Sequence, residues 1–137
     1  MGAWGVGVFD NDAAGDWVWD LIAAADGIAF LDETLTGVFS EAEDEDYVES
    51  GCEALAAAEV VAALKGKPLE GLDIQVELVA WLKGKPAPSD ELVQQSIRAV
   101  ELTMGEKSEQ RELWEETGED YETWKQLCTD LIARLNA

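Results

Sequence analysis

The chain has 137 residues, 47% of them hydrophobic and six of them tryptophan, which is enough apolar material for one folded domain over residues 1–137. Thirty acidic residues against nine basic ones give a net charge of −21, and there is no histidine. The charge argues against direct binding to nucleic acids or anionic membranes, and the lack of histidine excludes catalytic triads and metal sites that need an imidazole.

The negative charge is concentrated in the first part of the chain. Residues 1–64 contain fifteen acidic residues and no Lys or Arg. Such a field attracts cations and basic proteins. The chain start lacks the basic region of a secretory signal, no apolar run is long enough to span a bilayer, and Cys52 and Cys128 lie far apart in the sequence. These features predict a reduced, cytoplasmic protein.

The first nine residues alternate glycine with apolar side chains, which weakens a helix and predicts an extended segment packed across the domain. Asp10, Asn11 and Asp12 are then candidate N-caps for a helix that runs to about Ala25.

Helical patterns continue along the rest of the chain, interrupted by an acidic segment, residues 32–46, that is expected to be loop-like. Two helices end at copies of a Lys-Gly-Lys-Pro turn, whose cations, glycine and proline terminate a helix; the spacing of a P-loop is absent. Further helices are predicted over residues 28–37, 47–64, 72–82, 89–104, 108–117 and from about residue 120 onward. The sequence therefore predicts an all-α, compact single-domain bundle of about six or seven helices with an extended Gly/Trp-containing N-terminal segment.

Three aspartates, Asp12, Asp16 and Asp20, recur every fourth residue along one side of the first predicted helix. Carboxylates bind hard cations such as Mg²⁺, although a stripe of this kind is more often a solvated helix face. The motif that begins at Asp10 resembles a calcium loop but carries Ala14 and Leu21 where that loop needs ligands. The three aspartates are thus metal candidates only, and no catalytic or cofactor-binding residue is assigned.

Trp19 is expected on the same acidic side, opposite the apolar stripe that contains Trp17. Either another part of the chain covers Trp19, or it is exposed as an aromatic anchor for a partner. The candidate partner-binding residues are Trp19, Asp16, Asp20, Glu43, Asp44, Glu45 and Asp46.

Glu59 stands in an alanine-rich helical stretch, and all of its neighbours three and four positions away are apolar. A carboxylate in such a place must be paired, hydrogen-bonded or neutral. We interpret Glu59 as a buried structural carboxylate that accepts hydrogen bonds from the glycine-containing start of the chain around Trp4 and Gly5. A functional carboxylate is the alternative, because active sites also contain perturbed acids.

Three segments carry a distinctive pattern: a Gly-Ala-Trp-Gly start followed by Phe9-Asp10-Asn11-Asp12, the run Ala56–Ala63, and Glu112–Glu116 with Trp124 further on. In these segments the chain resembles the bacterial family catalogued as domain of unknown function 4259. The resemblance implies a small, standalone bacterial protein and supplies no reaction and no catalytic residue. The acidic stretch Glu41–Asp46 looks like an insertion particular to this chain.

Together these features favour a non-enzymatic, acidic protein-binding module, for instance an inhibitor or immunity-type protein that masks a basic partner. Two alternatives stay open: a metal-dependent hydrolase that uses carboxylates alone, and a housekeeping protein whose charge serves only solubility. No cofactor is expected, and the oligomeric state is not indicated.

Overall fold

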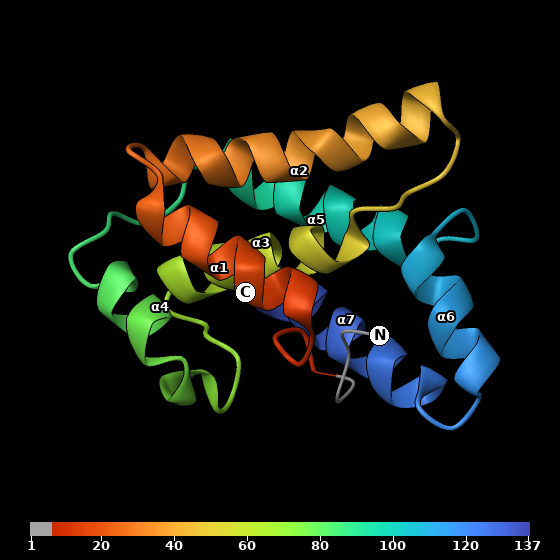
Figure 1. The fold of residues 1–137 in the computed structure, drawn as a ribbon. Helices are drawn as coiled ribbons and strands as arrows, with labels where there is room; N and C mark the ends of the chain where they lie inside the picture. The colour runs from red at the N-terminus through yellow and green to blue at the C-terminus, as the bar shows by residue number, and fades with distance from the viewer. Residues whose placement is uncertain (1–6) are drawn as a thin grey trace.

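The computed structural model describes residues 7–137 of the chain. These residues form seven α-helices and one 3-10 helix, with a single isolated β-bridge and no strand (Figure 1). The elements are α1 (Asp12–Ala23), α2 (Gly27–Asp44), α3 (Gly51–Leu64), η1 (Leu72–Ile74), α4 (Val76–Leu82), α5 (Asp90–Met104), α6 (Glu109–Thr117) and α7 (Tyr121–Asn136). The prediction of an all-α bundle of six or seven helices is confirmed. Within the described residues, none of these helices is both long and apolar enough to cross a membrane.

α3 is the central helix, and α1, α2, α5 and α7 pack around it (Figure 1). Every residue from Ala54 to Ala62 is buried, so this helix is enclosed on all sides over more than two turns. Alanine is the best helix former and its small side chain lets neighbouring helices approach closely. The alanine-rich sequence therefore explains both why α3 forms and why four helices can surround it.

The prediction of a loop-like acidic segment over residues 32–46 is wrong, because α2 continues as a helix to Asp44. Leu31, Leu35 and Val38 recur at helical spacing and are fully buried. Acidic residues at the C-terminal end of α2 are unfavourable for the helix dipole. Burial of the apolar stripe against α3 and α5 stabilises the helix by more than this unfavourable interaction destabilises it.

α3 begins at Gly51, four residues after the predicted start, because the preceding backbone is used in tertiary contacts. The N–H of Val48 donates to the carbonyl of Lys107 at 2.9 Å, and the N–H of Glu109 donates to the carbonyl of Val48 at 3.0 Å. The Glu41 carboxylate accepts hydrogen bonds from the N–H and the hydroxyl of Ser50, at 3.0 and 2.7 Å. One acidic residue of the segment thus ties α2 to the start of α3.

The two Lys-Gly-Lys-Pro turns end α3 and α4, as predicted. Gly66 and Gly84 have φ values of 84° and 78°, in the left-handed region that glycine adopts without strain. The predicted helix over residues 72–82 is divided, since the 3-10 turn η1 precedes α4.

Most of the predicted extended N-terminal segment, residues 1–6, lies outside the described residues. Residues 7–10 form a turn rather than an extended strand-like segment, since the N–H of Asp10 donates to the carbonyl of Gly7 at 3.0 Å. Val8 and Phe9 are buried in the core at this turn, which leads directly into α1.

Candidate protein-binding site

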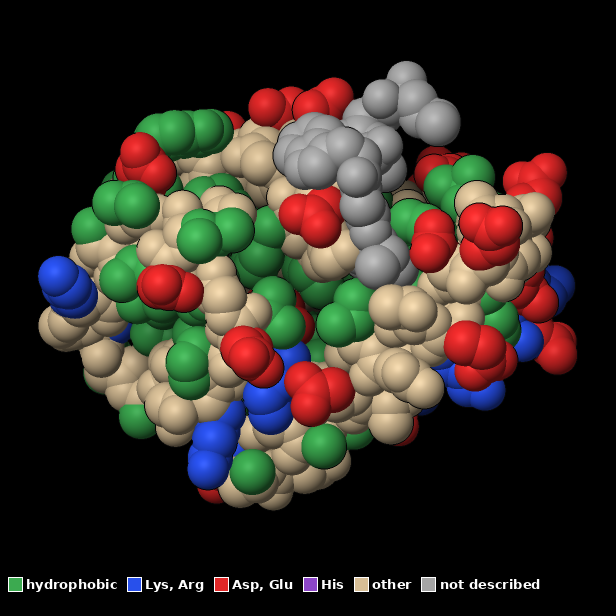
Figure 2. All heavy atoms as spheres, turned by 90° about the horizontal axis from the view of Figure 1, so that it is seen from below, with side chains coloured by type: hydrophobic (Ala, Val, Ile, Leu, Met, Phe, Trp, Pro, Cys, Tyr) green, Lys and Arg blue, Asp and Glu red, His purple; other side chains and the backbone are tan. Residues whose placement is uncertain are grey.

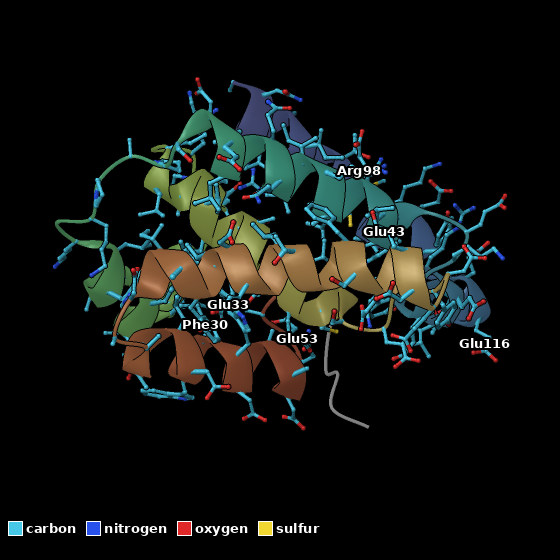
Figure 3. All side chains as sticks on the ribbon, turned by 90° about the horizontal axis from the view of Figure 1, so that it is seen from above. Phe30, Glu33, Glu43, Glu53, Arg98 and Glu116 are labelled. Carbon is cyan, nitrogen blue, oxygen red and sulfur yellow. The ribbon has the colours of Figure 1, made fainter. Side chains whose placement is uncertain are left out.

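α1 is held in one orientation by its N-cap and by its contact with α2. The Asn11 side chain accepts a hydrogen bond from the N–H of Ala14 at 2.8 Å. Trp17 Nε1 donates to the hydroxyl of Thr34 at 2.9 Å, and its ring stacks on Phe30 with the centroids 5.7 Å apart. Phe30 lies between α2 and α1 in Figure 3. These contacts bury one side of α1 and turn the opposite side to solvent.

Trp19 lies on the solvent side of α1, where 59% of its surface is exposed. It is two positions from the buried Trp17, so the two side chains leave the helix in nearly opposite directions. Asp12, Asp16 and Asp20 are exposed as well. Of the two alternatives for Trp19, the structure shows exposure. We call Trp19 and these three aspartates the acidic face of α1.

The other candidate partner-binding residues lie elsewhere. Glu43 and Asp44 end α2, Glu45 is its C-cap, and Asp46 follows; all four are exposed. α2 runs away from its junction with α1, so its C-terminal end lies at the other end of the molecule (Figure 1). Asp46 forms an exposed ion pair with Lys107 at 3.2 Å, which contributes little to stability. The predicted residues therefore divide into two separate surfaces.

The three metal candidates project into solvent at successive turns of α1 and do not converge on one point. In residues 7–137, no group of three or more His, Cys, Asp or Glu side chains is placed to hold a metal ion. Asp12, Asp16 and Asp20 contribute instead to the charge of the acidic face of α1.

Glu59 is 1% exposed, and its partner is Arg134 of α7, which lies far from it in the sequence. Arg134 Nη1 donates to Glu59 Oε1 at 2.8 Å, and Nη2 donates to Oε2 at 2.9 Å, which is a bidentate pair. Arg134 also donates to the Lys67 carbonyl at 3.1 Å and, through Nε, to the Asp130 carboxylate at 2.7 Å. This network joins α3 to α7, so Glu59 has a structural partner on the opposite helix.

Burial raises the pKa of Glu59 above its ordinary value, although the hydrogen bonds and charge of Arg134 act in the opposite direction. Burial also opposes the charge of Arg134, but Glu59 and Asp130 outweigh it and raise the pKa of the guanidinium. The partners expected for Glu59, Trp4 and Gly5, lie outside the described residues. Arg134 is adjacent in the sequence to Leu135, in the buried stripe of α7 that also includes Leu131. A cation beside an apolar stripe was the one sequence feature that could have indicated a buried ion pair on this helix.

The two free cysteines, far apart in sequence, line one small cavity of about 20 Å³ that the N-terminal turn, α3, α6 and α7 enclose, with Trp114 and Trp124 also in its lining. Cys128 is 1% exposed, and Cys52 is half-buried. Burial raises the pKa of Cys52 to about 11 and the pKa of Cys128 to about 12. Both thiols are consequently protonated at neutral pH.

We expect the native thiols to react slowly with a disulfide reagent such as Ellman's reagent at about pH 8, because the thiolate is the reactive form. A pKa near 11 lowers the thiolate fraction of Cys52 on the order of 100-fold relative to an ordinary cysteine. Stopped-flow absorbance in buffer and in urea measures the ratio of the native to the unfolded reaction rate. The variants Cys52→Ser and Cys128→Ser show which thiol gives each reaction. Native rates within a few-fold of the unfolded rates would contradict this description of the cavity.

An open groove of about 420 Å³ lies between α2 and α5. Phe39 and Ile97 supply its apolar side chains, and Arg98 with Glu91 and Glu101 supply charges of both signs. Arg98 and Glu43 mark this side of the molecule in Figure 3. The groove therefore differs from the acidic face of α1, whose charges have one sign.

Comparison of the sequence with known proteins assigns the chain to one protein family. A search of curated proteins and a search of solved structures found no match to the chain. The model of the family described as "Domain of unknown function (DUF4259)" matches residues 2–127. Because this match covers nearly the whole chain, the protein belongs to the DUF4259 family.

Proposed function

We propose that this protein is a non-enzymatic, acidic protein-binding module that binds a basic partner protein through the acidic face of α1. The observation that supports it is the exposure of Trp19, 59% of whose surface lies in solvent between exposed aspartates. The surrounding chain, residues 1–64, contains no Lys or Arg to neutralise these carboxylates.

Exposed tryptophan and clustered charge have different roles in such an interface. Tryptophan is enriched among the residues that contribute most to binding energy, because it buries a large area with few rotatable bonds. Carboxylates on the surrounding surface mainly accelerate association with a basic partner and select against acidic ones. The acidic face of α1 combines both elements on one rigid helix.

Among protein-binding functions, the negative charge fits best that of an inhibitor or immunity-type protein, which masks a basic partner. Masking requires a surface that is available before the partner arrives, and Trp19 meets this condition. Two free cysteines are compatible with a reducing compartment, and our proposal includes a cytoplasmic location.

Site-specific photo-crosslinking in cells tests the proposal. Benzoylphenylalanine is placed at Trp19 in one variant and, as a matched control, at Leu113 in another; Leu113 is an exposed apolar residue of α6. We expect a basic protein to crosslink from position 19 and not from position 113. Crosslinks to the same proteins from both positions, or to acidic proteins only, would contradict the proposal.

A further inference from the structure

Three of the most exposed large apolar side chains belong to two neighbouring elements, α1 and the η1–α4 segment. In residues 7–137, the large hydrophobic residues that stand out as exposed are Trp19 at 59%, Ile74 at 78%, Val76 at 66% and Leu113 at 47%. Single exposed hydrophobic residues are common, but several together mark interaction surfaces. Three of these four come from α1 and from the η1–α4 segment.

Ile74 and Val76 are not explained by the fold of their own segment. Leu72 and Leu78 anchor η1 and α4 in the core, and both are buried. Ile74 and Val76 face solvent between these anchors, and Val76 begins α4, where a β-branched residue does not favour a helix. Their apolar character therefore contributes to neither packing nor helix formation.

The two elements that carry these side chains are neighbours. α1 packs against α4, and the Trp81 ring of α4 lies so close to Gly27, at the start of α2, that a Cβ there would overlap it. α4 is thereby held beside the junction of α1 and α2. Figure 2 shows hydrophobic side chains gathered on its left, which is the α4 side of Figure 1, with carboxylates interspersed among them.

The charge around these apolar side chains is negative on both elements. Asp16 and Asp20 are exposed on α1, and Asp73 and Glu77 are exposed beside Ile74 and Val76. The segment from Leu72 to Leu82 contains no Lys or Arg, and Lys83 and Lys85 follow it at the end of α4, where Lys85 lies over the Trp81 ring. An occupant must then offer apolar side chains flanked by cations, which excludes nucleic acids and anionic lipid surfaces as good fits.

We propose that Trp19, Ile74 and Val76 form the apolar centre of a docking surface, and that its occupant is a cationic amphipathic helix of the partner protein. Such a helix presents an apolar stripe with Lys and Arg on its borders, which matches an apolar centre with an acidic rim. This inference rests on the proposed function and specifies the partner segment.

Calorimetry with two synthetic peptides tests the docking surface. One is an amphipathic Leu/Lys helix of about 18 residues, and the other has the same composition in an order without an apolar face. At about 0.15 M salt, where long-range attraction is largely screened, we expect the amphipathic peptide to bind roughly tenfold or more tightly than the scrambled one. Ile74→Ser/Val76→Ser and Trp19→Ser should each weaken its binding about tenfold, and Leu113→Ser, the matched control, should leave it within about twofold. Circular dichroism verifies that the variants fold.

The outcomes separate this inference from the proposed function. Equal binding of both peptides, or variants that bind like the unaltered protein, would overturn the docking surface and leave the binding of a basic partner standing. If neither peptide binds, the docking surface is overturned, whereas the proposed function is decided separately by the crosslinking from position 19. An equal loss of binding with Leu113→Ser would also overturn the inference, because the effect would not be specific to α1 and α4.

Discussion

Arg134→Ala is expected to lower the free energy of unfolding by about 3–5 kcal/mol at neutral pH, because it leaves the buried Glu59 carboxylate without its cation. Glu59→Ala should have an effect of similar size, since it leaves Arg134, whose side chain is only 16% exposed, without its bidentate acceptor. Each variant removes one side of the only ion pair that joins α3 and α7 among the described residues.

Urea denaturation of both variants and of the double variant measures this effect. Once both groups are gone no buried charge is left unpaired, so the double variant should be less destabilised than the sum of the two single variants. Asp130→Ala is the matched control, because it removes the other carboxylate bound to Arg134, one that is 59% exposed, and should cost about 1 kcal/mol or less. Additive effects of the two single variants would show that the pair does not act as a unit.

Leu35→Ala is expected to destabilise the protein by about 2–5 kcal/mol, because the fully buried side chain packs in the middle of α2 and its removal leaves a cavity. Ser40→Ala, on the exposed side of the same helix, should change stability by about 0.5 kcal/mol or less.

Thermal and urea unfolding of these two variants also test the helical extent of α2. If residues 32–46 were a surface loop, both substitutions would have similarly small effects. A destabilisation of Leu35→Ala no larger than that of Ser40→Ala would therefore contradict the packing of α2 on α3 and α5.

The helices whose ends carry strong local signals were predicted well. Ser89 accepts a hydrogen bond from the N–H of Leu92 at 3.1 Å and is the N-cap of α5, and Ser108 is likewise the N-cap of α6. Gly118, with a φ of 73°, ends α6 where the sequence indicated. Caps and stops depend on a few adjacent residues, so a single sequence contains them.

The features that the sequence did not reveal depend on distant residues. Acidic residues on the exposed side of α2 obscured the stripe of Leu31, Leu35 and Val38, which packing against other helices stabilises. Arg134 lies 75 residues from Glu59, and no local pattern connects them. The exposure of Trp19 likewise depends on which other elements cover α1, so helical geometry alone left two alternatives.

The central claim is that the acidic face of α1 binds a basic protein. The kinetics of association with the crosslinked partner test this claim most directly. The test variant is Asp12→Asn/Asp16→Asn/Asp20→Asn, and the control is Glu116→Gln/Glu119→Gln/Glu122→Gln, which has the same net charge. The control residues are exposed, and Glu116 lies far from α1 in Figure 3.

We expect the association rate of the unaltered protein to fall steeply between about 0.05 and 0.2 M salt. The test variant should associate more slowly and depend less on salt, whereas the control should behave like the unaltered protein. Equal effects of both triple variants, or association that is indifferent to salt, would contradict the claim and assign the charge to solubility alone.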